Sequence, residues 1–118
     1  TLHRLTPSVE GAFSDMMEIL ERGDELAECY FADNDLIAVG AMRALKTRGY
    51  RIPEDISIVG FDNIPFSNIV EPSLTTIHVP KKEMGILAVE RLVSRIEKRK
   101  STPVKIEVST HLIKRHSA

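Results

Sequence analysis

The sequence predicts an α/β fold with a three-layer parallel sheet, and residues 28–63 carry that prediction. They contain a short apolar run, then apolar residues at helical spacing, then a second apolar run. Gly49 and Pro53 separate the helical segment from the second run. Two buried strands joined by a helix form a right-handed crossover, and the strands are then parallel. The centre of the chain is therefore expected to be strand, helix, parallel strand.

Before this unit, the sequence predicts one helix. Pro7 marks its start, and either Thr6 or Ser8 can supply the N-cap. Arg22 and Gly23 mark its end. The apolar residues between them follow the helical period, which indicates core packing: Val9, Phe13, Met16, Met17 and Leu20.

The central unit begins with the apolar strand 29–32, which contains the single cysteine, Cys29. One cysteine cannot form an internal disulfide, so Cys29 is expected to be a reduced, buried core residue. The triplet Asp33, Asn34 and Asp35 then caps the helix that ends near Gly49. The second strand occupies 56–61.

After the central unit, two prolines bracket residues 65–72 and leave room for one or two helical turns. A β-prone run at 75–79 ends at Pro80. Residues 81–100 then carry the longest helical pattern in the chain. Basic residues at its end suit the helix dipole better than they suit DNA binding.

The last predicted strand follows a break at Thr102 and Pro103. Val104, Ile106 and Val108 alternate with charged residues, which indicates a strand with one solvated face. Leu112 and Ile113 continue this strand. The basic tail 114–116 is expected to be exposed.

Polar side chains follow the two central strands where each ends. Parallel strands end at one edge of a sheet, and open α/β sheets bind ligands there. Asn34 and Asp62 are therefore candidate ligand contacts for a polyhydroxylated or amine-bearing molecule. The alternative is that Asn34 only caps a helix and Asp62 only forms a turn. His78 could face the same crevice or have a structural role.

Composition and motifs exclude several classes of function. The 118 residues allow one core, with 42% hydrophobic and 28% charged residues. A net charge of −1 gives no electrostatic footprint for nucleic acid. No apolar run reaches the roughly 18 residues of a membrane span. There is no nucleophile elbow, phosphate loop or zinc-ligand spacing, so neither an enzyme nor a cofactor or metal site is expected.

Several strings in the sequence resemble the lactose/galactose-repressor family of bacterial transcription regulators. These strings are residues 31–35, 38–41, 43–45, 53–63, 72–77 and 112–117. The resemblance implies the C-terminal part of a periplasmic-binding-protein-like (type I) effector-binding domain. Residues 1–79 would be the C-terminal subdomain, 80–103 a crossover helix that belongs to the other subdomain, and 104–118 the returning strand.

The resemblance also implies a function. A small effector, a sugar or a purine-like molecule, would bind between two subdomains. Asn34 and Asp62 match ligand-contacting positions of the family. Val79 stands where some sugar-responsive members have glutamine, which weighs against a sugar. Effector binding would be coupled to operator DNA in the cytoplasm, through a helix-turn-helix expected to lie outside this chain.

The family further implies a homodimer, with expected contacts through Val39, Phe66, Ile69 and Val70. The alternative function is a periplasmic sugar-binding protein of a transporter, which shares the fold. An upstream helix-turn-helix would indicate the regulator, and a secretory signal would indicate the binding protein.

The helix at 81–100 poses a packing problem. It carries a broad apolar stripe, and each such side chain is worth about 1.5–3 kcal/mol when buried. Either the helix folds back on its own sheet or it docks on another copy of the chain. The second arrangement is expected, because the first two helices should already cover the sheet.

Overall fold

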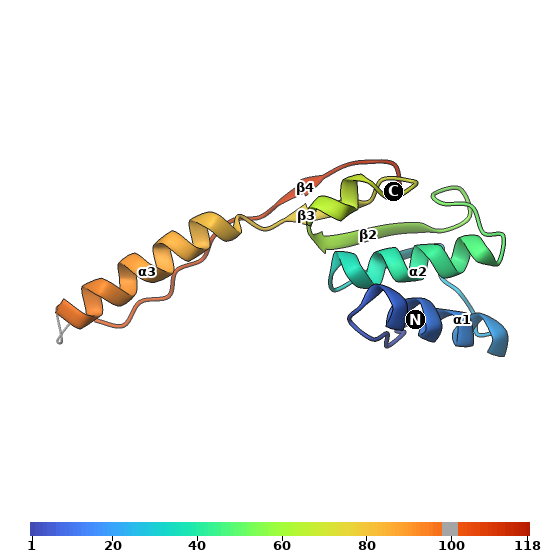
Figure 1. Ribbon diagram of the computed structural model, residues 1–118, viewed down its shortest axis with the longest axis horizontal. Helices are drawn as coiled ribbons and strands as arrows, with labels where there is room; N and C mark the ends of the chain where they lie inside the picture. The colour runs from blue at the N-terminus through green and yellow to red at the C-terminus, as the bar shows by residue number, and fades with distance from the viewer. Residues whose placement is uncertain (98–101) are drawn as a thin grey trace.

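The structure is a computed structural model that describes residues 1–97 and 102–118. Its elements are α1 (Val9–Arg22), β1 (Cys29–Phe31), α2 (Asp35–Thr47), β2 (Ser57–Asp62), the 3-10 helix η1 (Pro65–Asn68), β3 (Thr75–His78), α3 (Lys81–Glu97) and β4 (His111–Ile113) (Figure 1). The predicted α/β class is confirmed.

The sheet has four strands in the order β1-β2-β3-β4. β1, β2 and β3 are parallel, as expected, and β4 is antiparallel to β3. The last predicted strand is wrong at 104–108, because hydrogen bonding to β3 begins only at His111, and it is confirmed at its continuation, Leu112 and Ile113, which lie in β4. A chain returning along α3 has no neighbouring strand until it reaches β3, and a strand needs a partner for its backbone groups.

The core lies between one face of the sheet and the helices α1 and α2. Met16 and Ile19 from α1 and Leu45 from α2 pack in one cluster with Ile58 and Leu74. This confirms that the methionine-containing stripe of α1 is core packing. Of the two candidate caps for α1, Ser8 is the one used: its side chain accepts a hydrogen bond from Gly11 N at 3.1 Å.

β1 lies at an edge of the sheet, and this position overturns the expectation for Cys29. Cys29 is exposed, and Phe31 is 60% exposed. Phe31 meets Phe61 edge-on, with ring centroids 6.3 Å apart, on the sheet face opposite the core. An apolar run predicts a strand, but which of its faces is covered depends on elements elsewhere in the chain.

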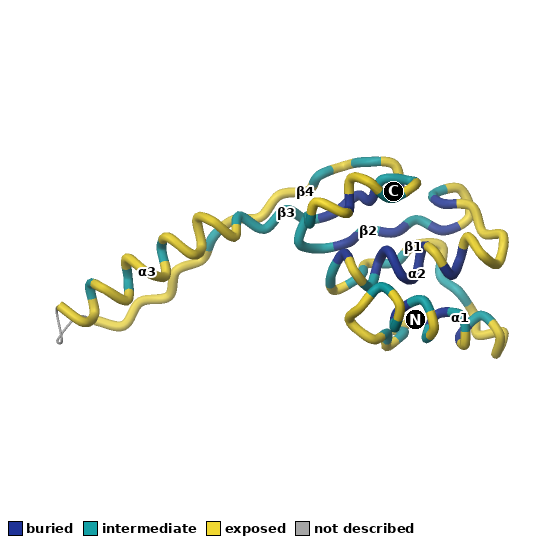
Figure 2. Tube along the Cα trace, viewed as in Figure 1, coloured by how far each residue is buried: buried dark blue, intermediate teal, exposed yellow. Residues whose placement is uncertain are grey.

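α3 extends away from the rest of the structure, and the segment after residue 101 leads back to the sheet (Figure 1). None of the residues Lys81–Glu97 is buried (Figure 2). The radius of gyration is 18.2 Å, whereas a compact domain of this length has roughly 13–14 Å. The alternative in which α3 folds back on its own sheet is therefore wrong. The basic residues 98–100 lie outside the described residues.

Candidate functional site

The three parallel strands end at one edge of the sheet, and the predicted effector residues lie along it. Asn34 caps the helix that follows β1, Asp62 ends β2, and His78 ends β3. The strand register pairs Asp62 with His78 and pairs His78 with His111 of β4. A row of polar side chains therefore crosses β2, β3 and β4 where the chain leaves for α3 and returns.

The turn at the end of β2 has an unusual backbone. Asp62 has φ 109° and Asn63 has φ 51°, in the region that residues other than glycine rarely adopt. Asn63 N donates to Thr76 Oγ1 at 3.3 Å, and Arg115 donates through Nη2 to Asn63 Oδ1 at 2.7 Å. Such strained conformations persist only where the surrounding structure compensates for their cost. They concentrate at ligand-binding and active sites.

Asp35 provides much of that compensation. Its carboxylate is fully buried and accepts hydrogen bonds from Thr76 Oγ1 at 2.5 Å and from Ile64 N at 2.9 Å. Its position in the first turn of α2 also favours a negative charge. Asp35 therefore fastens the start of α2 to β3 and to the turn that presents Asp62.

Asn34 does cap a helix: its Oδ1 accepts a hydrogen bond from Ile37 N at 2.9 Å, in the first turn of α2. This bond does not use the two N–H donors of the amide, so capping and a ligand contact are compatible. His78 is half-buried; its Nδ1 lies 3.1 Å from Asn63 Nδ2, and its ring centroid lies 5.0 Å from that of His111.

Two positively charged residues that were not predicted as site residues complete the site. Lys81 Nζ donates to the main-chain oxygen of Asp62 at 2.6 Å and lies 3.3 Å from its Oδ1. Arg115 is half-buried instead of exposed as expected, and its Nη1 donates to Leu74 O at 2.7 Å. Nothing local in the sequence distinguishes Arg115 from its basic neighbours. Lys81 does carry a signal, because a cation is unfavourable in the first turn of a helix.

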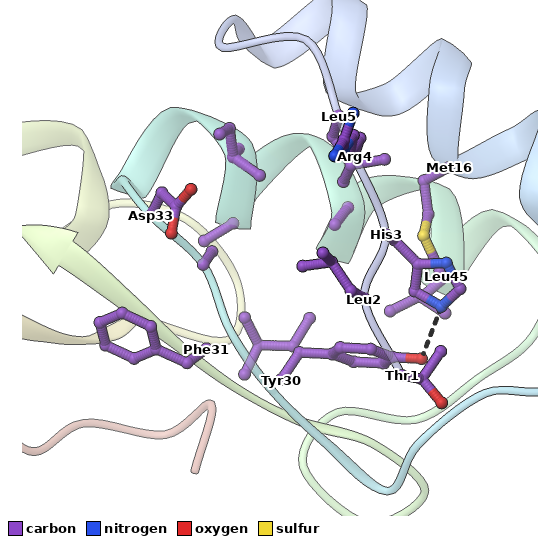
Figure 3. A pocket seen from close by; sticks show the side chains of 15 residues that line it. Thr1, Leu2, His3, Arg4, Leu5, Met16, Tyr30, Phe31, Asp33 and Leu45 are labelled. Atoms are coloured by element: carbon purple, nitrogen blue, oxygen red, sulfur yellow. Dashed lines mark hydrogen bonds between the residues drawn. The ribbon is translucent and has the colours of Figure 1, made fainter.

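A cavity lies elsewhere in the chain. It has a volume of about 370 Å³ and lies between residues 1–5, α2 and the aromatic residues of β1 (Figure 3). At one side His3 Nε2 lies 3.2 Å from the hydroxyl of Tyr30. Asp33 is among the residues that line it, but Asn34, Asp62 and His78 are not. The predicted effector residues therefore form a polar edge of the sheet and line neither this cavity nor the second hollow described next.

A second hollow, of about 560 Å³, contains three of the four residues expected at a dimer interface. Val39, Phe66 and Val70 line it. Phe66 is 45% exposed and Ile69, just outside the hollow, is 74% exposed, whereas Val39 is buried. We call Val39, Phe66, Ile69 and Val70 the η1 surface.

Within residues 1–97 and 102–118, no group of three or more His, Cys, Asp or Glu side chains is placed to hold a metal ion. No helix in the same part of the chain is long and apolar enough to cross a lipid bilayer.

The fold is that of an open α/β domain with polar residues at the carboxyl edge of its sheet, and comparison with known proteins gives its family. The family model described as "periplasmic binding protein-like domain" matches residues 2–118. The chain belongs to this family.

Its relatives are transcription regulators. The HTH-type transcriptional repressor PurR of Pasteurella multocida is 41% identical over 108 residues, which cover 92% of this chain and 32% of that protein. The ribose operon repressor of Halalkalibacterium halodurans is 41% identical over 87 residues, 74% of this chain and 26% of that protein. The chain thus spans about a third or less of these repressors.

A solved structure confirms the resemblance to the lactose/galactose-repressor family. The LacI family transcriptional regulator of Enterococcus faecalis with bound ribose superposes with a TM-score of 0.88 at 34% identity, covering 99% of this chain and 43% of that one. These relatives are named as regulators and not as enzymes, in agreement with the expectation for this chain.

Proposed function

We propose that this chain is the C-terminal part of the effector-binding domain of a cytoplasmic LacI/GalR-type transcription regulator. A small molecule, a sugar or a purine-like compound, contacts Asn34, Asp62 and His78 and alters the affinity of a homodimer for operator DNA. The coupling needs to be only about 1–3 kcal/mol to switch operator occupancy.

The polar edge of the sheet is the observation that carries this proposal. Asp62 stands at the carboxyl end of β2 in a conformation that neighbouring side chains hold in place. Ligands of open α/β sheets bind at that edge. Regulators that superpose on this chain were solved with ribose and with lactose bound. Support for a sugar therefore comes from the relatives, whereas Val79 weighs against it.

The division of the chain follows from the same proposal. Residues 1–79 and 104–118 form one subdomain, and 80–103 carry the helix that packs on the other subdomain in the longer protein. The exposed apolar residues of α3, including Leu92 and Ile96, support this division. The relatives carry repressor names, which favours a regulator over a periplasmic sugar-binding protein.

Isothermal titration on the protein in its full natural length tests the role of Asp62. A thermal-shift screen with D-ribose, lactose and hypoxanthine first identifies a ligand. Asp62→Asn, which keeps the turn conformation but removes the charge, should then weaken binding about 10- to 100-fold, because a hydrogen bond to a charged group contributes about 1.5–3 kcal/mol.

Asp33→Asn is the matched control, since Asp33 is exposed on the same edge but is not a proposed contact. Equal affinities for the wild type, Asp62→Asn and Asp33→Asn would show that the effector does not use Asp62.

A further inference from the structure

His78 is joined to Arg115 through the side chain of Asn63. Arg115 donates through Nη2 to Asn63 Oδ1 at 2.7 Å, and Asn63 Nδ2 lies 3.1 Å from His78 Nδ1. Two further hydrogen bonds hold Arg115 in place: its Nη1 donates to Leu74 O at 2.7 Å, and its main-chain N donates to Thr75 Oγ1 at 2.9 Å. A chain of hydrogen bonds therefore runs from a fixed guanidinium group to the ring of a proposed effector contact.

This chain of hydrogen bonds determines which nitrogen of His78 carries the proton. A guanidinium group only donates hydrogen bonds, so the atom of the Asn63 amide that faces Arg115 must be the oxygen. The amide nitrogen, which also only donates, then faces His78 Nδ1, and Nδ1 must accept. A neutral imidazole whose Nδ1 accepts has its proton on Nε2. His78 is therefore the Nε2–H tautomer.

The Nε2 atom of His78 is accessible. Within residues 1–97 and 102–118 it has no hydrogen-bond partner, and no buried side-chain nitrogen or oxygen in these residues lacks one. Nε2 is therefore open to solvent. The strand register pairs His78 with Asp62, and neighbouring strands lie about 4.7–4.9 Å apart. A hydrogen-bond donor and an acceptor carboxylate thus lie on adjacent strands at the polar edge of the sheet.

We propose that Arg115, acting through Asn63, is a positioning residue that makes His78 a hydrogen-bond donor to the effector. The inference rests on the proposed function, because it takes Asp62 and His78 as effector contacts. One ligand must then offer an acceptor to His78 and a donor to Asp62.

The class of ligand that meets both requirements is a neutral molecule with an acceptor close to an N–H or O–H group. A polyamine offers only donors, so His78 Nε2–H would face a group that cannot accept. The ammonium group of Lys81, 3.3 Å from Asp62 Oδ1, also repels a cation at this edge.

NMR of the imidazole nitrogens tests the tautomer without any ligand. Long-range proton–nitrogen correlation spectra of this 118-residue chain distinguish a protonated ring nitrogen from an unprotonated one, and the signals that are lost in His78→Phe belong to His78. In the wild type, Nε2 should be protonated and Nδ1 should not. Asn63→Asp replaces the amide donor by an acceptor and should place a proton on Nδ1. Aspartate tolerates the positive φ of this position, and Asn68→Asp, at an exposed position, is the control that adds the same charge.

Arg115→Met tests the other end of the chain of hydrogen bonds. Without the guanidinium group the amide of Asn63 can turn its oxygen toward His78, so both tautomers should appear. Lys114→Met, which removes a neighbouring exposed cation, should leave the proton on Nε2. A wild type with its proton on Nδ1 would overturn the proposal, as would an Nδ1 that stays unprotonated in Asn63→Asp. Asn63→Asp decides alone if thermal melting shows that Arg115→Met does not fold.

Binding to the full-length protein tests the donor role of His78. With whichever of D-ribose, lactose and hypoxanthine raises the melting temperature, His78→Phe should weaken binding about 3- to 10-fold, because it removes one neutral hydrogen bond. His78→Gln, whose amide keeps an N–H donor, should weaken it less. Putrescine, a diamine, should show no binding that depends on Asp62. Equal affinities of the wild type and His78→Phe would contradict the proposal, and so would Asp62-dependent binding of putrescine.

The proposed function fails separately. If no ligand affinity of the full-length protein depends on Asp62, the effector assignment falls, whereas the NMR spectra still decide whether Arg115 and Asn63 set the tautomer of His78.

Discussion

Gly60 of β2 lies beside the buried carboxylate of Asp35. A Cβ at this position would lie 2.3 Å from Asp35 Oδ1 and 2.9 Å from a methyl group of Leu74. Asp35 cannot retreat, because it is bound to Thr76 and to Ile64 N. A side chain at position 60 would therefore displace the network that supports the Asp62 turn.

Gly60→Ala should lower the free energy of unfolding by about 1–3 kcal/mol, the usual cost of overpacking. Urea denaturation measures it. Gly85→Ala is the control: a Cβ there meets nothing within 4 Å, and alanine favours the helix. Equal stability of Gly60→Ala and the wild type would mean that Asp35 lies far enough from β2 to leave room for a Cβ at position 60.

Asp55 is the residue with the clearest electrostatic perturbation. Arg51 donates through Nη2 to Asp55 Oδ1 at 2.5 Å and through its main-chain N to Oδ2 at 2.8 Å. Hydrogen bonds from the side chain and backbone of Arg51 lower the pKa of Asp55 from 3.8 to about 2. Because the folded pKa lies below the unfolded value, the pair stabilises the fold above pH 4, and this contribution is lost as the pH falls from 4 to 2.

Carboxyl chemical shifts followed by NMR test this assignment. Arg51→Gln should raise the pKa of Asp55 toward its usual value, whereas Arg43→Gln, which removes a separate ion pair with Glu10, should leave it unchanged. The same pKa in wild type and Arg51→Gln would rule out the ion pair as the cause.

At the scale of elements, α2 and α3 differ in how much of each helix is packed against the rest of the structure. α2 buries eight of its residues, whereas α3 buries none. A helix of 17 residues without tertiary packing is marginal in water.

We therefore expect the amides of α3 to exchange with solvent far faster than those of α2 in the isolated 118-residue chain. Hydrogen-exchange mass spectrometry compares them in one sample. Equal protection of both helices would instead indicate that α3 is covered by another copy of the chain, the arrangement expected from its apolar stripe. Dilution of the sample should then remove the protection.

The helices and strands formed by local pattern were predictable. The cap at Asn34, the glycine at the end of α1 and the β1-α2-β2 crossover all follow from neighbouring residues, which also narrowed the cap of α1 to Thr6 or Ser8. Exposure was not predictable in the same way. Cys29 was expected to be buried and is exposed, and Arg115 was expected to be exposed and is half-buried. Both expectations were wrong because the environment of each residue is set by residues distant in the sequence.

The same distinction between local pattern and distant contacts applies to the residues of the candidate site. Asn34, Asp62 and His78 could be proposed because each directly follows or ends a strand. The residues that hold them, such as Thr76 and Arg115, act across 13 to 52 positions of sequence, and no local pattern marks such contacts.

At the scale of the whole molecule, the η1 surface is the expected dimer contact. Ile69→Asp should convert a dimer to monomers in analytical ultracentrifugation, because a two-fold interface would bury both copies of the charge. Its effect on the stability of the monomer should stay within about 0.5 kcal/mol, since Ile69 is 74% exposed.

Leu2→Asp is the control, with a side chain that is also exposed but lies outside the η1 surface. If both variants sediment like the wild type, the η1 surface is not the contact.

The edge position of β1 affects the solubility of the chain. The bonds of β1 to β2 use Glu28 O and Ala32 N, so the alternation of a parallel ladder directs the backbone groups of Cys29 and Phe31 outward. An open strand edge of this kind is a template for aggregation. β1 offers only three residues, and the carboxylates of Glu28 and Asp33 flank them. Resistance to aggregation at this edge therefore depends on the short length of β1 and on two charged residues that contribute nothing to the core.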